Sequence, residues 1–482
     1  MPMLDAKDGV VVATGSFGQS LQRGLGEVVS SVSGMMSEPV LRLGVTGLAR
    51  AGKTVFITAL VANLLDRGRM PQLRAAAAGR IDAVHLQPQP DMTLPRFAYE
   101  DHLAALTGDA PHWPQSTRHV SELRLSFLVR PAGRLAGALG PRRLQVDIVD
   151  YPGEWLLDLA LLDKSYAVWS EAVLERIAKE PAAAGYLAMA RAEDGAQPLA
   201  EPRAQALAAS FAGWLADARA LGRADLTPGR FLLPGDLAGS PVLTFAPLPP
   251  PAMTPRGCLW REMERRFEAY KAKVVKPFFR EHFARIDRQI VLVDVLGAIH
   301  AGPRAVEDLR RTMAEVLGAF RPGRQGWLAG ITGARRVERI LFAATKADHL
   351  HHSQHAALAG ITEALLREAR SRADFAGART AALVLSSLRA TVEQEIERDG
   401  ARLGAVRGRL LESGRQAVMY PGELPADPAR LLSPARQGAE RWLGADYALM
   451  SFAPARLNLR PGEGPPHIRL DRAAEFLIGD RL

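Results

Sequence analysis

Residues 41–60 read LRLGVTGLARAGKTVFITAL. A short apolar run leads into the pattern GxxxxGK[ST], which begins at Gly47 and ends at Thr54, and an apolar helical pattern follows directly. A strand, a glycine-rich loop and a helix start, in that order, are the context in which this pattern binds phosphate. The glycines let backbone N–H groups approach phosphate oxygens, and the helix N-terminus adds partial positive charge. The stretch therefore predicts a nucleotide phosphate loop in an α/β domain.

Three side chains of this loop are candidates for chemistry. Lys53 is expected to place its ammonium on the β- and γ-phosphates as a catalytic residue, and the Thr54 hydroxyl is expected to bind Mg²⁺. Arg50 stands where small residues are usual, and its guanidinium either stabilises transition-state charge or points to solvent or a nearby acid. The nucleotide is expected to contact Gly47, Ala49, Arg50, Ala51, Gly52, Lys53, Thr54 and Val55.

The composition is typical of a folded globular protein, with 48% hydrophobic and 23% charged residues. A chain of 482 residues is too long for one compact core, so two or three domains are expected. The net charge of +9, mostly from arginine, is compatible with a negatively charged partner. The single cysteine, Cys258, excludes an internal disulfide and a Cys-based zinc site, and it fits a reducing cytoplasm.

Residues 1–38 are predicted to form an amphipathic segment ahead of the first strand. Asp5 and Asp8 argue against a signal peptide, and no run of about 18 apolar residues predicts a membrane span anywhere in the chain. A helix here packs on the body of the protein or docks on a membrane or a partner. The prediction rests on apolar residues at helical spacing, namely Phe17, Leu21, Leu25, Val28, Val29 and Val32.

The pattern beyond the phosphate loop predicts an interrupted α/β domain with a mainly parallel sheet. Residues 154–286 are rich in Ala and Leu with helical periodicity, broken at Pro277, and are interpreted as a helical insertion. Strands are expected at 122–129, 143–149, 288–295, 337–344 and 380–385, short strand-like pieces at 404–411 and 416–420, and helices at 304–320 and 356–373. The expected parts are a nucleotide-binding domain (39–153 and 287–392), the insertion, and a small α+β region (393–482) ending in a helix at 471–478.

Further loops with nucleotide chemistry follow predicted strands, whose carboxyl ends share one edge of a parallel sheet. In Asp150-Tyr-Pro-Gly153, of the form DxxG, Asp150 is expected to hold Mg²⁺ through water and the Gly153 N–H to meet the γ-phosphate. In Thr345-Lys346-Ala347-Asp348, of the form [NT]KxD, the Asp348 carboxylate would accept from N1–H and the exocyclic amine of guanine. Adenine lacks that donor pair, so the loop predicts GTP and GDP as ligands.

Two weaker signals complete the predicted site. Ser386-Ser387-Leu388 is similar to a short element whose backbone N–H meets the guanine O6. The Lys346 stem would lie along the base, and Thr345 is expected to contact the nucleotide as well. Thr117, in the loop before the second strand, is expected to coordinate Mg²⁺ and sense the γ-phosphate, with Thr93 as the alternative.

The whole chain resembles the YcjX-like family of bacterial P-loop GTPases. The segments that carry the resemblance are GLARAGKTVFITALV at 47–61, WPQST at 113–117, DYPGEW at 150–155 and TKAD at 345–348. The resemblance implies a cytoplasmic protein that binds and slowly hydrolyses GTP, with a helical insertion and a place among stress-response genes. It also implies an inner-membrane protein as a partner, because the family's genes tend to lie beside the gene of one.

Two features depart from the usual GTPase pattern. Glu154 stands where many GTPases have the Gln that orients the attacking water. A carboxylate would accept a proton from that water, but its charge is unfavourable near phosphate, so Glu154 is either catalytic or faces away. The histidines between His349 and His355 either bind zinc, through His351 and His355 one helical turn apart, or begin a polar helix, which we favour.

Three functional hypotheses follow from these residues. The leading one is a GTP-driven switch in which the loops around Thr117 and Gly153 release on hydrolysis and move the helical insertion. The second is a membrane-associated scaffold in which the bound guanine nucleotide is mainly structural. The third, an ATP-dependent kinase or ATPase, requires that Asp348 does not read guanine. DNA and RNA are not expected as partners, since no basic-aromatic module is present.

Overall fold

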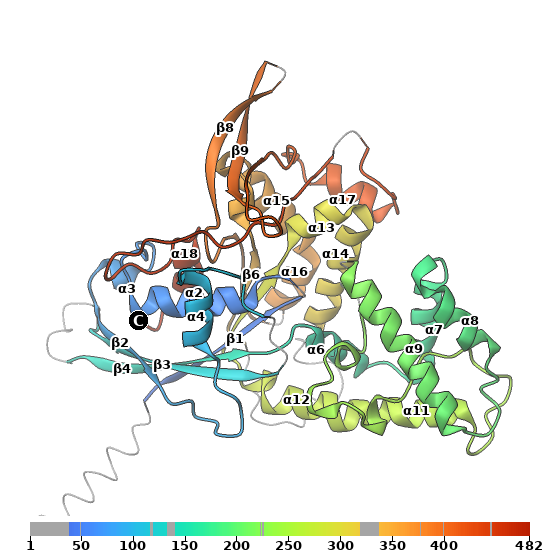
Figure 1. Cartoon of the computed structure of the whole chain (residues 1–482). Coiled ribbons are helices and arrows are strands. Elements are labelled where there is room, and N and C mark those ends of the chain that lie inside the picture. The colour runs from blue at the N-terminus through green and yellow to red at the C-terminus, as the bar shows by residue number, and fades with distance from the viewer. Residues whose placement is uncertain are drawn as a thin grey trace, which may run out of the picture. The chain divides into compact units, whose positions relative to one another are not determined.

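A seven-stranded sheet organises the computed structural model, with strand order β2-β3-β4-β1-β5-β6-β7 (Figure 1). β1 pairs in parallel with β5, β5 with β6 and β6 with β7, whereas β2–β3 and β3–β4 are antiparallel. The predicted α/β fold with a mainly parallel sheet is thereby confirmed. The strands are β1 (Val40–Gly47), β2 (Ile81–Gln87), β3 (Ser121–Val129), β4 (Arg142–Asp150), β5 (Arg288–Val293), β6 (Arg339–Ala344) and β7 (Arg379–Val384).

The structure describes part of the chain, and residues 41–482 form one compact unit. The described residues are 38–48, 50–115, 119–132, 140–221, 223, 226–318, 337–375, 377–398, 400–443 and 446–482. Three predictions fall largely or wholly outside this set: the amphipathic segment over 1–38 except its last residue, Thr117 in the loop before β3, and Ala49 in the phosphate loop.

Helices cover both faces of the sheet, which explains the apolar runs 290–293 in β5 and 340–344 in β6. Successive residues of a strand point to opposite faces, so Ile290 and Leu292 of β5 belong to one core cluster and Val291 and Val293 to another. The first cluster includes residues of α2 (Lys53–Leu65), α3 (Arg74–Ala77), α4 (Tyr99–Thr107) and α18 (Leu470–Ile478). The second includes residues of α13 (Val295–Ala301), α14 (Pro303–Gly318), α15 (His355–Leu365), α16 (Arg367–Phe375) and α17 (Ala429–Arg436).

Most residues between β4 and β5 are helical and have an aromatic-rich core of their own, here called the helical region (residues 154–286). Trp169 stacks on Phe267 within that core, with 5.0 Å between ring centroids. Figure 1 shows α7, α8, α9 and α11 grouped away from the sheet. The helices are α6 (Glu154–Leu157), α7 (Tyr166–Ile177), α8 (Ala184–Ala192), α9 (Glu201–Ala220), α10 (Gly229–Leu232), α11 (Leu259–Tyr270) and α12 (Lys276–Glu281).

The structure corrects several element boundaries. The predicted strand over 288–295 ends at Val293, because the Asp294 side chain accepts from the Gly297 N–H and caps α13. The single helix predicted over 356–373 is two helices, α15 and α16. The helix predicted from 260 onward is interrupted by a π-helical turn at Lys271–Val275, just before Pro277, which lacks the N–H that a regular α-helix would use there.

Two strands were not predicted. β2 lies within the connection expected to be irregular, at an outer edge of the sheet, and only Ile81 and Val84 of its residues are buried. β8 (Thr391–Arg398) opens a separate antiparallel sheet with β9 (Ala401–Arg409) and β10 (Gln416–Met419), in the order β10-β9-β8. Figure 1 shows the β8–β9 hairpin projecting from the body of this unit.

Candidate functional site

A cavity of about 570 Å³ opens where β1, β6 and β7 end, at the carboxyl edge of the parallel strands. This is the edge at which open α/β sheets bind ligands. Sequence-predicted residues that line the cavity are Gly47, Arg50, Ala51, Gly52, Lys53, Thr54, Val55, Glu154, Thr345, Lys346, Asp348, Ser386, Ser387 and Leu388. The fold thus brings together four segments that are far apart in the sequence.

The phosphate loop has the backbone conformation that its glycines allow. Gly52 precedes α2 with a φ of 81°, and Arg50 adopts a φ of 64°. The first N–H groups of a helix have no intrahelical acceptor, so the start of α2 offers donors to the cavity. Lys53 Nζ lies 3.5 Å from Asp150 Oδ1, and both side chains are largely buried. Lys53 thus lies where the phosphate loop, the start of α2 and the end of β4 meet.

Gly153 lies against the phosphate loop itself. A Cβ on Gly153 would lie 2.1 Å from the carbonyl oxygen of Gly47, which is a backbone atom and cannot rotate away. Gly153 and Asp150 do not line the cavity directly but form the layer behind it. The alternative metal ligand Thr93 is exposed, and its hydroxyl donates to Asp91 Oδ1 at 2.6 Å.

Glu154 points toward the helical region and remains at the cavity wall. Arg219 of α9 donates to Glu154 Oε1 at 2.6 Å, and both residues line the cavity. The side chain of Glu154 is 8% exposed, so the guanidinium offsets a nearly buried negative charge. Arg219 was missed by sequence reasoning, because it lies in an Ala-rich helix with no motif around it.

The segment after Gly153 is bound to the helical region at further points. The guanidinium of Arg230 lies 3.2 Å from the ring centroid of Trp155. The Gly229 N–H donates to Asp158 Oδ1 at 2.7 Å, and burial raises the pKa of Asp158 to about 7 while this bond and one from Tyr270 oppose the shift. The segment that follows β4 is therefore joined to α9, α10 and α11 by direct contacts.

The predicted base-binding loop is fixed by the start of β8. The Ala390 N–H donates to Asp348 Oδ2 at 2.9 Å, and the Thr391 hydroxyl donates to the backbone carbonyl of Asp348. Lys346 has a φ of 60° and pairs with Asp294, the residue that caps α13. Asp348 is 4% exposed and still lines the cavity, so its carboxylate is held in a defined orientation at the cavity wall.

The C-terminal region completes the cavity, which sequence reasoning did not foresee. Trp113 and Pro114, just before the undescribed Thr117, line it together with Leu411, Ser451 and Phe452. The Trp113 Nε1–H donates to the Phe452 carbonyl at 2.7 Å. His349 also lines the cavity, and burial lowers its pKa, so the ring is neutral at pH 7.

Comparisons with known proteins identify the family of this chain. The model of the YcjX-like family, DUF463, matches residues 41–482. This chain belongs to the YcjX-like family. It is 38% identical over 456 residues to the Ras-like GTPase YcjX of Escherichia coli (strain K12), covering 92% of this chain and 96% of that protein. It is 35% identical over 472 residues to the Ras-like GTPase YcjX of Shewanella oneidensis, covering 92% and 94%.

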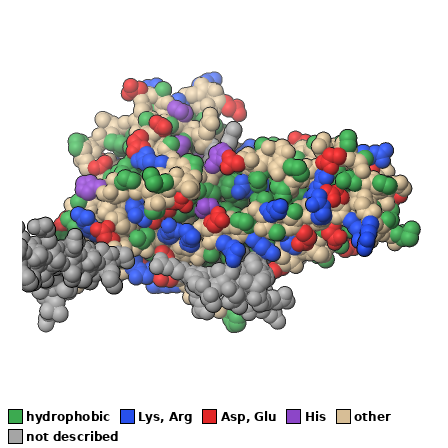
Figure 2. Space-filling view, turned by 90° about the horizontal axis from the view of Figure 1, so that it is seen from below, with side chains coloured by type: hydrophobic (Ala, Val, Ile, Leu, Met, Phe, Trp, Pro, Cys, Tyr) green, Lys and Arg blue, Asp and Glu red, His purple; other side chains and the backbone are tan. Residues whose placement is uncertain are grey.

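The surface of this YcjX-like chain carries charges of both signs. Figure 2 shows Lys and Arg side chains interspersed with Asp and Glu over the face drawn there. Within the described part of the chain, no helix is both long enough and apolar enough to cross a membrane.

Proposed function

We propose that this chain binds GTP and GDP in the cavity at the carboxyl edge of the sheet and hydrolyses GTP. The observation that supports this most directly is the joint presence of Lys53 and Asp348 in one cavity wall. The Lys53 ammonium would pair with the β- and γ-phosphates, and the Asp348 carboxylate would accept from the two N–H donors of guanine. The loop from Ser386 to Leu388 would meet the guanine O6 beside them.

Magnesium is the metal that this donor set fits. Hydroxyl and carboxylate oxygens are ligands that Mg²⁺ prefers, and Thr54 and Asp150 supply them at the start of α2 and the end of β4. We propose that these two residues hold Mg²⁺, with Thr117 as a third ligand. When bound, the ion would neutralise charge on the phosphate oxygens.

Glu154 and Arg50 are the proposed catalytic residues besides Lys53 and Thr117. In the observed arrangement Arg219 pairs with Glu154, which reduces the repulsion between this carboxylate and a nearby phosphate. Glu154 would then be able to orient or deprotonate the attacking water. Arg50, exposed on the phosphate loop, would add positive charge from the open side of the cavity.

We further propose that nucleotide state is transmitted to the helical region. Gly153 would sense the γ-phosphate, and the contacts of Glu154, Trp155 and Asp158 with α9, α10 and α11 would carry the change. In this proposal residues 39–153 and 287–392 form the GTPase domain, 154–286 the moving insertion and 393–482 a separate region. The proposed partner is an inner-membrane protein, which this chain would meet from the cytoplasm in a stress response, and residues 1–38 would either pack on the body of the protein or dock on a membrane or a partner.

The first experiment is a binding titration of the full chain with GTP, GDP and ATP, followed by a turnover measurement. We expect binding of both guanine nucleotides, much weaker binding of ATP, and slow hydrolysis. In Asp348→Asn, preference should shift from GTP to xanthosine triphosphate, because the base of the latter has a carbonyl acceptor where guanine has its exocyclic amine donor. Equal affinity for ATP and GTP would overturn the proposal, and tight GTP binding with no turnover would favour a scaffold in which the nucleotide is structural.

A further inference from the structure

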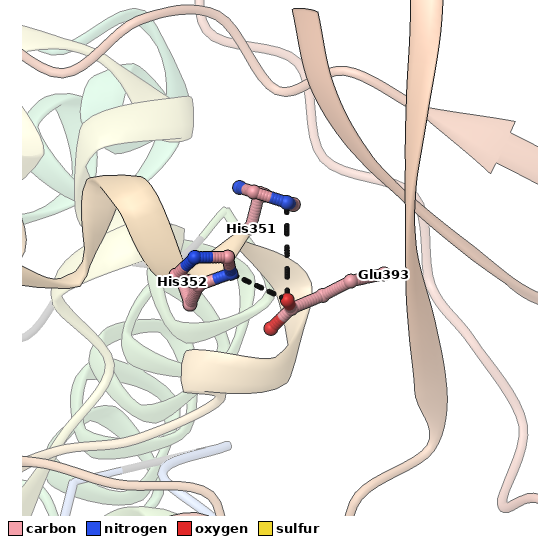
Figure 3. Close-up of side chains that lie close together, drawn as sticks. All are labelled: His351, His352 and Glu393. Atoms are coloured by element: carbon pink, nitrogen blue, oxygen red, sulfur yellow. Dashed lines mark hydrogen bonds and ion pairs between the residues drawn. The ribbon is translucent and has the colours of Figure 1, made fainter.

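A cluster of three potential metal ligands lies outside the cavity, between the loop after Asp348 and strand β8. It consists of His351, His352 and Glu393, whose ligand atoms all lie within 4.8 Å of one another. Figure 3 shows both imidazoles directed at the Glu393 carboxylate from the opposite chain segment. His352 Nδ1 lies 2.7 Å and His351 Nε2 3.8 Å from the same oxygen, Oε2. The cluster is thus formed only when the two segments come together.

Neighbouring contacts hold these side chains in place. The Nδ1 of His351 is hydrogen-bonded to the Ser353 hydroxyl at 2.9 Å, which leaves Nε2 directed at Glu393. The His351 ring packs under Gly404 of β9, where a Cβ would lie 2.6 Å from ring atoms. Arg389 lies 3.5 Å from the other carboxylate oxygen, Oε1, so Oε2 is the one that faces the histidines. Such outer contacts are what orient metal ligands in proteins.

We propose that His351, His352 and Glu393 bind a divalent transition-metal ion of the Zn²⁺ class. Two imidazole nitrogens and one carboxylate oxygen are a ligand set that zinc accepts, with water in the fourth position. Tetrahedral bonds of about 2.0–2.2 Å place ligand atoms roughly 3.3 Å apart. His351 Nε2, now 3.8 Å from Oε2, would therefore move toward this oxygen, and His352 Nδ1, now 2.7 Å from it, would move away. His352 has a side chain that is 69% exposed, so it can rotate to meet the ion at little cost.

The ion would fasten the β8–β9 hairpin to the loop that carries Asp348. Glu393 lies on the strand whose first residue, Thr391, donates to the Asp348 carbonyl, and Ala390 donates to the Asp348 carboxylate. His351 lies on the other segment, shortly after Asp348 in the sequence. A metal bridge would therefore stabilise both hydrogen bonds. This bridge would restrain the loop proposed to bind guanine, and that consequence rests on the proposed function.

Equilibrium dialysis of the untagged full chain against Zn²⁺, without nucleotide, tests the site. We expect one ion per chain, with affinity reduced at least tenfold in His352→Ala and in Glu393→Gln. His85→Ala, which removes an exposed histidine on β2, is the matched control and should bind as the wild type does. Far-UV circular dichroism of each variant separates loss of the site from loss of the fold.

Amide hydrogen exchange with and without Zn²⁺ then tests the bridge, again without nucleotide. Residues 345–355 and 390–396 should exchange more slowly with Zn²⁺ in the wild type and at an unchanged rate in Glu393→Gln. If folded His352→Ala and Glu393→Gln bind Zn²⁺ as tightly as the wild type, or if the wild type binds none, the site is refuted. Slower exchange that persists in Glu393→Gln would refute the bridge. A failure of GTP binding changes neither readout.

Discussion

Replacing Asp158 with Asn should remove a pH-dependent part of the stability of the helical region. Asp158 is fully buried and accepts hydrogen bonds from the Gly229 N–H and the Tyr270 hydroxyl. Burial raises its pKa to about 7, against the opposing effect of those two bonds. Asn keeps the size of the side chain and an oxygen for Gly229, and it carries no charge at any pH. The substitution therefore isolates the ionisation of this one carboxyl group.

The sign and size of the effect follow from the pKa difference. The carboxyl titrates near 3.8 in the unfolded chain and near 7 in the folded one, so the folded state holds a proton that the unfolded state has lost. The stability that this proton contributes is complete below pH 3.8 and is lost as the pH rises through 7. At about 1.36 kcal/mol per pH unit, the wild type should lose about 2.5 kcal/mol from this group between roughly pH 5 and 8.

Urea unfolding monitored by tryptophan fluorescence at pH 5, 6, 7 and 8 measures this effect. The stability of Asp158→Asn relative to the wild type should rise across the series, by about 2.5 kcal/mol in total. Asp217→Asn, which alters an exposed carboxylate on α9, is the control and should follow the wild-type curve. Parallel curves for Asp158→Asn and the wild type would show that the buried carboxyl does not change its protonation in this range.

Two further substitutions test the contacts around the cavity. In Arg219→Ala the Glu154 carboxylate loses its 2.6 Å partner, so GTP affinity should fall about tenfold and GDP affinity less, because the unpaired charge lies nearer the γ-phosphate. Fluorescence titration with both nucleotides measures this, and equal losses would contradict it. Gly153→Ala should destabilise the fold by about 2 kcal/mol and abolish nucleotide binding, since its Cβ would meet the Gly47 carbonyl. Thermal unfolding tests this, with Gly185→Ala on α8 as the control. A Cβ at Gly185 would meet no other atom, so this substitution should leave the stability of the fold unchanged or raise it.

The sequence by itself determined the local features of this protein. The phosphate loop was predictable because two glycines, a lysine and a threonine at fixed spacing allow one backbone path between a strand and a helix. The buried strands were predictable as well, since a strand covered on both faces is mostly apolar, as the run from Ile290 to Val293 in β5 shows. β2 escaped this reasoning because this edge strand buries only Ile81 and Val84 and so has no apolar run.

The tertiary structure decided which distant residues meet. Glu154 and Arg219 are 65 positions apart, and Trp113 and Phe452 are 339 apart. No local pattern specifies such pairs, because they depend on how the helical region and the C-terminal region fold back onto the sheet. The same holds for His351 and Glu393, which face each other only through the placement of β8. Motif spacing reports the backbone path of a single loop, whereas the charge balance of the cavity depends on packing between regions far apart in the chain.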